Sequence, residues 1–125
     1  MGKKHSPLFL QRVEHSRSVI NECDIDEFSS MLGDNDSLIV IDVREKHEYE
    51  SGHMEHALHI SKGVLERDIE KHPIGTSDRI VLYCGGGFRS AIAAQSLKEM
   101  GYENVYSLWG GWRAILATDI RKSSL

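Results

Sequence analysis

The stretch from Ile80 to Met100 constrains the fold of this chain more than any other part of it. Residues 80–83 are apolar and strand-forming, whereas residues 91–100 have the composition of a helix that ends at Gly101. Between these two runs lie Cys84, Gly85, Gly86, Gly87, Phe88, Arg89 and Ser90. The order predicts a strand, a glycine loop and a helix, with the cysteine at the carboxyl end of the strand and under the helix amino-terminus. In α/β folds, that position binds anions.

The three consecutive glycines predict a loop whose backbone amides turn inward. Glycine adopts left-handed conformations that other residues avoid, and successive N–H groups can then form a nest around a negative centre. Helix amino-termini and neighbouring cations favour the ionised form of a cysteine, so we expect a thiolate nucleophile at Cys84. The alternative is an inert buried cysteine beside an ordinary turn. Such cysteines are common, but three glycines and Arg89 at the start of a helix are harder to explain in that way.

Strand and helix signals alternate along the rest of the chain, which predicts an α/β fold with a mostly parallel sheet. The run from 37 to 42 is largely apolar until Asp42, as expected of a strand covered on both faces. Asp24 and Glu27 predict a capping box at the start of a helix. The predicted strands are 19–23, 37–42, 57–60, 80–83 and 104–108, and the predicted helices are 7–16, 25–32, 45–51, 64–71, 91–100 and 112–118.

The chain has 125 residues, which is enough for one domain with its own hydrophobic core. We expect a helical extension over residues 1–18 and a single domain over residues 19–125. The helix of the extension is expected to pack on the domain or on a second subunit. Residues 1–6 also fit the pattern for N-myristoylation of Gly2; the alternative is a frayed, basic terminus.

Composition argues against several classes of partner. The formal net charge is −4 and the sequence contains no long stripe of Lys and Arg, so nucleic acid is not expected as a partner. A disulfide between Cys23 and Cys84 would disable the proposed nucleophile, so we expect a reducing, cytoplasmic environment. No apolar stretch approaches the length of a membrane span, and the amino-terminus lacks a signal-peptide core. The histidines lack metal-site spacing, and no metal or cofactor is expected.

Four short motifs, taken together, resemble those of the rhodanese homology domain. They are Asp42-Val43-Arg44-Glu45 followed by Glu48, Gly52-His53, the run from Cys84 to Ser90, and Gly110-Gly111-Trp112. The resemblance covers residues 19–118 and implies a three-layer α/β/α fold with a five-stranded parallel sheet in the order 3-2-4-5-1. The chain departs from the family at residues 52–57, where Gly-His-Met-Glu-His-Ala replaces the usual Gly-His-Ile-Pro-Gly-Ala. We expect this departure to reshape a turn and to affect packing more than chemistry.

The resemblance also implies sulfur transfer. The Cys84 thiolate would take the outer sulfur of thiosulfate or of a persulfide donor, hold it as a persulfide, and pass it to a thiol, a carrier protein or, in an assay, cyanide. Residues 85–90 would bind the persulfide. Asp42 and Arg44 would lie beside this loop, where such a pair more often locks a loop than contacts a substrate. Arg89 has two alternatives, holding the donor or pairing with a carboxylate.

Two other functions are weighed against sulfur transfer. Related phosphatases have five residues between the cysteine and the arginine, whereas this chain has four, which tightens the rim and favours sulfur over phosphate. A rhodanese module without turnover would carry a persulfide or bind a protein, but modules that have lost catalysis usually lack the cysteine. Because residues 85–88 carry no cation, we expect weak thiosulfate binding and room for a preference for persulfide donors. The oligomeric state, the natural donor and the natural acceptor are left open.

Overall fold

The structure is a computed structural model and describes residues 5–34 and 37–124. Its helices are α1 (Pro7–Val19), α2 (Ile25–Asp34), α3 (Lys46–Ser51), α4 (Leu65–Asp68), α5 (Phe88–Met100) and α6 (Gly111–Leu116), and short 3-10 turns η1 (Lys62–Val64) and η2 (Ile69–Lys71) flank α4. Its strands are β1 (Asn21–Cys23), β2 (Ile39–Asp42), β3 (His53–Met54), β4 (Leu58–His59), β5 (Ile80–Tyr83), β6 (Val105–Leu108) and β7 (Lys122–Ser123). The helix predicted over 64–71 is therefore divided, and α5 begins inside the predicted glycine loop.

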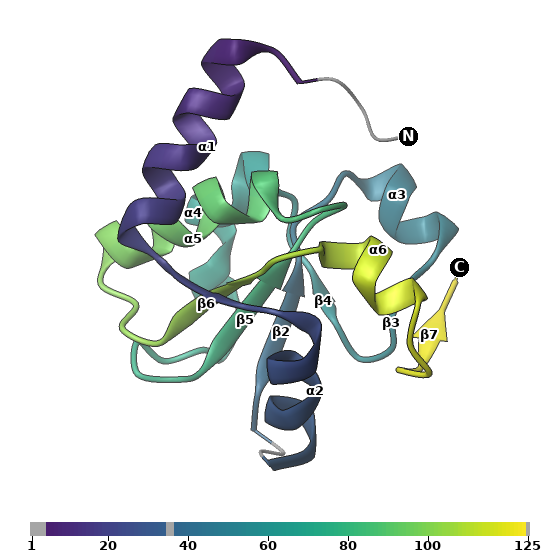
Figure 1. The fold of residues 1–125 in the computed structure, drawn as a ribbon. Coiled ribbons are helices and arrows are strands. Elements are labelled where there is room, and N and C mark those ends of the chain that lie inside the picture. Colours follow the sequence, from purple (N-terminus) through teal and green to yellow (C-terminus); the bar gives the residue numbers. More distant parts are fainter. Residues whose placement is uncertain (1–4, 35–36, 125) are drawn as a thin grey trace.

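Five parallel strands form the central sheet, in the order β4-β2-β5-β6-β1. Numbered along the chain, these strands give the order 3-2-4-5-1, so the predicted topology is confirmed. The chain leaves β2 toward β4 on one side and leaves β5 toward β6 on the other (Figure 1). The carboxyl ends of β2 and β5 therefore lie at the switch point of the sheet, where open α/β folds place ligands.

Helices cover both faces of this sheet, which confirms the predicted three layers (Figure 1). Successive side chains of a strand point to opposite faces. Ile80 and Leu82 pack with α4 and α5, whereas Val81 and Tyr83 pack with α2 and α6. All four of these β5 side chains are fully buried. A strand that is apolar on both faces requires this arrangement.

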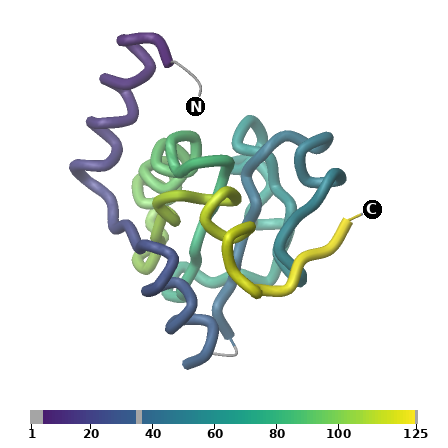
Figure 2. Tube along the Cα trace, turned by 45° about the vertical axis from the view of Figure 1, so that its right-hand side comes forward, coloured from purple at the N-terminus to yellow at the C-terminus, as the bar shows by residue number. Residues whose placement is uncertain are grey.

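Helix α1 lies outside α5, on the side away from the sheet (Figure 2). Ser6 occupies its N-cap position, and Pro7 is its first residue, as predicted. Ser16 is fully buried and donates a hydrogen bond of 2.7 Å to the Gln95 side chain of α5. Packing on the domain, one of the two expected alternatives, is thus observed. The division into an extension and a domain stays a prediction, and Gly2 lies outside the described residues.

A second, two-stranded sheet joins β3 to β7 in antiparallel register, and the sequence analysis did not anticipate it. It contains the departure from the family pattern at residues 52–57. His56 stands where the family usually has glycine, and it adopts a left-handed φ of 70°. The reshaped turn directly follows β3, which pairs with β7. Within the described residues, no helix is both long and apolar enough to cross a membrane.

Candidate active site

Cys84 directly follows β5 and precedes α5, as the sequence predicts. Its side chain packs in the core and only 1% of the residue is exposed, yet it also lines a cleft at the switch point. Strand β5 holds it there because Leu82 and Cys84 share one face of the strand, and that face is covered by α5. The sulfur atom therefore sits between a hydrophobic core and an open cleft.

Three polar groups converge on the Cys84 sulfur. The amide of Gly87 donates to Sγ at 3.2 Å, and the amide of Ser90 donates at 3.3 Å. The Ser90 hydroxyl lies 3.5 Å from Sγ and 2.8 Å from the hydroxyl of Ser107 on β6. Both serines are fully buried. The two amides form part of the inward-facing arrangement that the glycine loop predicts, and the Ser90 hydroxyl accepts from the Cys84 thiol.

The backbone carbonyls of the loop point outward and accept hydrogen bonds from the start of α6. The carbonyl oxygens of Cys84, Gly85 and Gly86 accept hydrogen bonds from the amides of residues 112, 113 and 110, at 2.7, 3.2 and 3.0 Å. In a trans peptide unit, the N–H points away from the C=O of the same unit. Anchoring these oxygens outside the loop therefore turns the amides of residues 85–87 toward the cleft.

This anchoring explains why glycine stands at two positions. Gly111 has φ 51°, and a Cβ there would lie 2.4 Å from the Cys84 carbonyl oxygen. Gly87 has φ 109°, and its Cβ would lie 3.2 Å from the Leu108 carbonyl oxygen. Both contacts are with backbone atoms, and both φ values favour glycine. The separate glycine motifs of the sequence are thus parts of one loop–helix contact.

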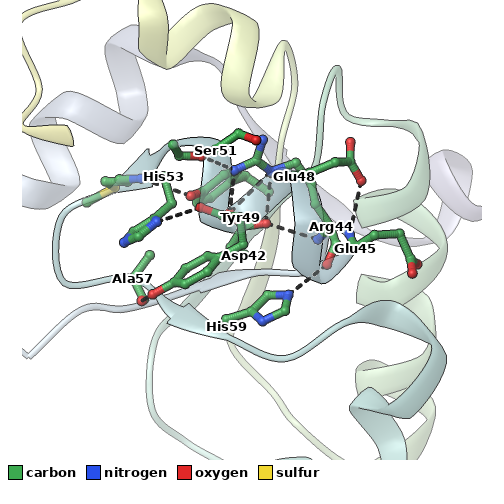
Figure 3. A network of polar contacts seen from close by, with 12 residues as sticks. Asp42, Arg44, Glu45, Glu48, Tyr49, Ser51, His53, Ala57 and His59 are labelled. Atoms are coloured by element: carbon green, nitrogen blue, oxygen red, sulfur yellow. Dashed lines mark hydrogen bonds and ion pairs between the residues drawn. The ribbon is translucent and has the colours of Figure 1, made fainter. Parts of the chain in front are cut away.

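Asp42 and Arg44 form a buried ion pair beside the loop. Arg44 Nη2 donates to Asp42 Oδ2 at 2.8 Å, and the two side chains are 4% and 0% exposed. Arg44 also donates to the Gly52 carbonyl at 2.7 Å, and its guanidinium lies 4.8 Å from the Trp112 ring centre. Figure 3 shows Asp42 and Arg44 within a polar network that ties β2 to α3. These contacts lock the loop after β2, and Arg44 also lines the cleft.

His53 and His59 belong to the same network. His53 Nδ1 lies 2.8 Å from the Tyr49 carbonyl oxygen, and its ring stacks on Tyr49 at 3.7 Å. His59 Nε2 lies 2.8 Å from the Arg44 carbonyl oxygen (Figure 3). His53 therefore packs within this network.

Arg89 pairs with Glu48, and pairing with a carboxylate is one of the two alternatives left open by the sequence. Its Nη1 and Nη2 donate to Glu48 Oε1 and Oε2 at 2.8 and 3.1 Å. The hydrogen bonds from Arg89 lower the pKa of Glu48 to about 2, although partial burial acts in the opposite direction. The pKa of Arg89 is raised, chiefly by these hydrogen bonds and partly by the charge of Cys84. The pair links α3 to α5 across the cleft.

The cleft in front of Cys84 has a volume of about 1070 Å³. Besides the predicted loop, its lining includes side chains that sequence reasoning did not single out as site residues: His5, Phe9, Glu48, Trp109 and Arg113. Because His5 precedes α1, helical spacing gives no signal that it lies beside Phe9. Arg113 Nη1 lies 4.0 Å from the Cβ position of Gly86. One cation thus reaches the uncharged loop from α6.

The second cysteine has a different environment. Both cysteines are free, but Cys23 is buried on the opposite face of the sheet among α2 and α6 residues. Burial raises the pKa of the Cys23 thiol to about 12, and the nearby carboxylates of Glu27 and Asp24 act in the same direction. In the described ranges 5–34 and 37–124, no group of three or more His, Cys, Asp or Glu residues is arranged to hold a metal ion.

Comparison with known proteins identifies the family. The family model for the rhodanese-like domain matches residues 24–118. A candidate sulfur carrier protein of Bacillus subtilis, YrkF, is 33% identical over 103 residues, which are 80% of this chain and 55% of that protein. A tRNA uridine(34) hydroxylase of Erwinia tasmaniensis is 36% identical over 96 residues, which are 68% of this chain and 25% of that protein. The chain thus spans from a quarter to about half of these relatives.

A solved structure agrees with the fold. The polysulfide-sulfur transferase homodimer of Wolinella succinogenes superposes with a TM-score of 0.80 at 23% identity, covering 94% of this chain and 88% of that chain. The chain belongs to the rhodanese-like family, as its motifs indicate. The family match and the relative named as a candidate sulfur carrier support a function related to sulfur transfer.

Proposed function

We propose that this chain is a sulfurtransferase that carries sulfane sulfur as a persulfide on Cys84. The convergence of the Gly87 and Ser90 amides on Cys84 Sγ supports the proposal most directly. Donors placed in this way stabilise a sulfur anion without any rearrangement during the reaction. Cys84 also lines the cleft, which is the side from which a small donor would approach it.

The reaction has two balanced steps. In the first, the Cys84 thiolate attacks the outer sulfur of thiosulfate, a sulfur–sulfur bond forms on Cys84, and the bond to the leaving sulfite breaks with its electron pair. The negative charge stays on the terminal persulfide sulfur. In the second step, a thiolate or cyanide attacks that sulfur and releases the Cys84 thiolate. A persulfide donor would enter the same cycle and leave as a thiolate.

The remaining predicted residues act by positioning. Gly85 and Gly86 supply inward-turned amides, because the carbonyls of Cys84 and Gly85, which precede those amides, are anchored outside the loop. Asp42 and Arg44 fix the neighbouring loop. Arg89 holds α5 against Glu48. Phe88 forms part of the cleft wall.

A persulfide carrier is the second candidate, and the relative named as a candidate sulfur carrier favours it. In that role a thiol or a carrier protein would be the partner, and turnover with thiosulfate would be slow. We propose the reducing cytoplasm as the setting for either role, because both require a free Cys84. A phosphatase is disfavoured because only four residues separate Cys84 from Arg89.

Mass spectrometry of the intact protein tests the proposal. After exposure to thiosulfate or to a small-molecule persulfide, the protein should gain one sulfur atom, and the Cys84→Ser variant should not. A sulfur gain without thiocyanate formation on addition of cyanide would favour the carrier. No gain from any sulfane donor, or a gain that persists in Cys84→Ser, would overturn the proposal. Hydrolysis of an aryl phosphate without persulfide formation would identify a phosphatase instead.

A further inference from the structure

The cleft is larger than a thiosulfate ion requires. Its volume of about 1070 Å³ reaches the upper end of the roughly 300–1,000 Å³ typical of pockets for drug-sized ligands. Thiosulfate has only five heavy atoms, and the Cys84 loop by itself provides donors for one sulfur anion. Most of the cleft surface is therefore available to the part of a substrate that does not react.

Four rings line one side of the cleft, and we call His5, Phe9, Phe88 and Trp109 the aromatic wall. The His5 ring centre lies 4.8 Å from that of Phe88, and Phe88 lies 5.6 Å from Trp109. Phe9 lies 5.3 Å from His5 and 6.3 Å from Phe88. These separations fall in the range of favourable aromatic contacts. The wall starts at Phe88 in the Cys84 loop and continues onto the first turn of α1.

Helix α1 is fixed in a way that makes the aromatic wall a built feature. Ser16 and Val13 of α1 are buried, and Arg12 donates to Gln95 of α5 at 2.8 Å. The guanidinium of Arg17 lies 3.7 Å from the Trp109 ring centre. This helix lies outside residues 24–118, which the family model matches. His5 and Phe9 are therefore additions to the common domain, placed at its reactive centre.

A cation completes the cleft. Arg113 lines it beside Gly86, and among the described residues no carboxylate lies within ion-pair distance of its guanidinium. The other two arginines of the cleft are neutralised, because Arg44 pairs with Asp42 and Arg89 pairs with Glu48. One free positive charge and one aromatic surface suit a ligand with an anionic end and an apolar body.

We propose that α1 makes the site selective for organic sulfur donors in which the transferable sulfur is attached to an aromatic or similarly apolar group. The inference rests on the proposed sulfur transfer and names its substrate class. For a thiosulfonate donor, Cys84 attacks the outer sulfur, the bond between that sulfur and the sulfonyl sulfur breaks, and a sulfinate leaves with the electron pair. The persulfide on Cys84 retains the second negative charge. The organic group meanwhile packs on the aromatic wall.

Two probes differ in this organic group alone: benzenethiosulfonate and methanethiosulfonate. With cyanide as acceptor, kcat/KM for each donor reports the first half-reaction. In Phe9→Ala, the ratio of the benzene value to the methane value should fall about tenfold, which corresponds to about 1.4 kcal/mol of lost ring contact. Leu8→Ala is the matched control, because Leu8 is 79% exposed on the same helix and does not line the cleft. Its ratio should equal that of the unmodified protein.

A binding measurement on the unmodified protein tests the same selectivity without depending on the folding of a variant. The chain has two tryptophans, Trp109 and Trp112, and both line the cleft. Benzenesulfinate, the product of the aromatic probe, should change their fluorescence with a Kd at least tenfold lower than that of methanesulfinate. Equal Kd values, or a ratio that stays within twofold in Phe9→Ala, would overturn the selectivity. If neither probe forms a persulfide but thiosulfate or a small-molecule persulfide does, the proposed donor class is refuted; if no sulfane donor forms a persulfide, the proposed function is refuted.

Discussion

Replacing Glu48 by glutamine removes the charge of the Glu48–Arg89 pair and leaves its geometry nearly intact. Glutamine keeps an oxygen that can accept from Arg89, and it still fits the capping box in which Glu48 accepts from the Glu45 amide at 3.0 Å. The variant therefore isolates the electrostatic contribution of the pair to the link between α3 and α5. The measurement is the free energy of unfolding in urea, with unfolding monitored by far-UV circular dichroism.

The magnitude follows from the pKa of Glu48, which hydrogen bonding to Arg89 lowers from 4.5 to about 2. Converted at about 1.4 kcal/mol per pH unit, this difference corresponds to at most about 3 kcal/mol. Glu48 and Arg89 are 28% and 35% exposed, so water screens the interaction, and we expect Glu48→Gln to cost about 1–2 kcal/mol at pH 7. Glu50→Gln, on the same helix and facing the exposed Lys46, should cost less than about 0.5 kcal/mol.

The cost should depend on pH in one direction. Because the folded protein holds the pKa of Glu48 below its ordinary value, the stabilisation is complete above pH 4.5 and disappears as the pH falls toward 2. The difference in unfolding free energy between the unmodified protein and Glu48→Gln should therefore shrink to roughly half by pH 3. A difference that stays constant from pH 7 to pH 3, or that is absent at pH 7, would refute an electrostatic role for the pair.

Three further results are expected. Gly111→Ala should destabilise the protein by about 3 kcal/mol or more and abolish persulfide formation, because its Cβ would lie 2.4 Å from the Cys84 carbonyl oxygen. Gly63→Ala, with open space at its Cβ, is the control. Equal unfolding midpoints for the two variants would contradict the predicted clash. Iodoacetamide at pH 8 should alkylate Cys84 far faster than Cys23, whose pKa of about 12 leaves about one thiolate in ten thousand. Equal labelling of the two cysteines in peptide mass spectrometry would argue against a reactive Cys84. Arg113→Gln should raise KM for thiosulfate about fivefold with little change in kcat, because an exposed charge contact is worth about 1 kcal/mol; an unchanged KM would exclude Arg113 from donor binding.

Local sequence signals and the family motifs together predicted the framework of the fold correctly. The apolar run of β5 and the glycines after it determine where Cys84 lies, because both are local signals with few structural solutions. The strand order needed the motifs as well, since periodicity alone does not say which strands are neighbours. The capping box at Asp24 and Glu27 also forms, with reciprocal hydrogen bonds of 2.8 and 2.9 Å. The site roles of the loop residues stay predictions until the persulfide is measured.

Contacts between distant polar residues were not predictable. Lys122 and Ser123 of β7 carry no strand pattern, and only pairing with β3 makes them extended. Arg89 had two plausible partners, and the choice of Glu48 depends on where α3 packs, which no local signal reveals. Phe9 falls within the helix predicted over residues 7–16, but its position at the cleft follows from how α1 packs on α5. These are tertiary outcomes that a one-dimensional pattern leaves undetermined.

The anchoring of three loop carbonyls by α6 separates two properties of the site, the stabilisation of the sulfur anion and the choice of donor. The electrostatics around the sulfur are set from behind by main-chain groups, which are the same for almost any amino acid. The Phe88 side chain faces outward into the cleft and takes no part in that framework. Position 88 can therefore be exchanged to admit a different donor without altering how the sulfur anion is held, and evolution is free to change the two independently.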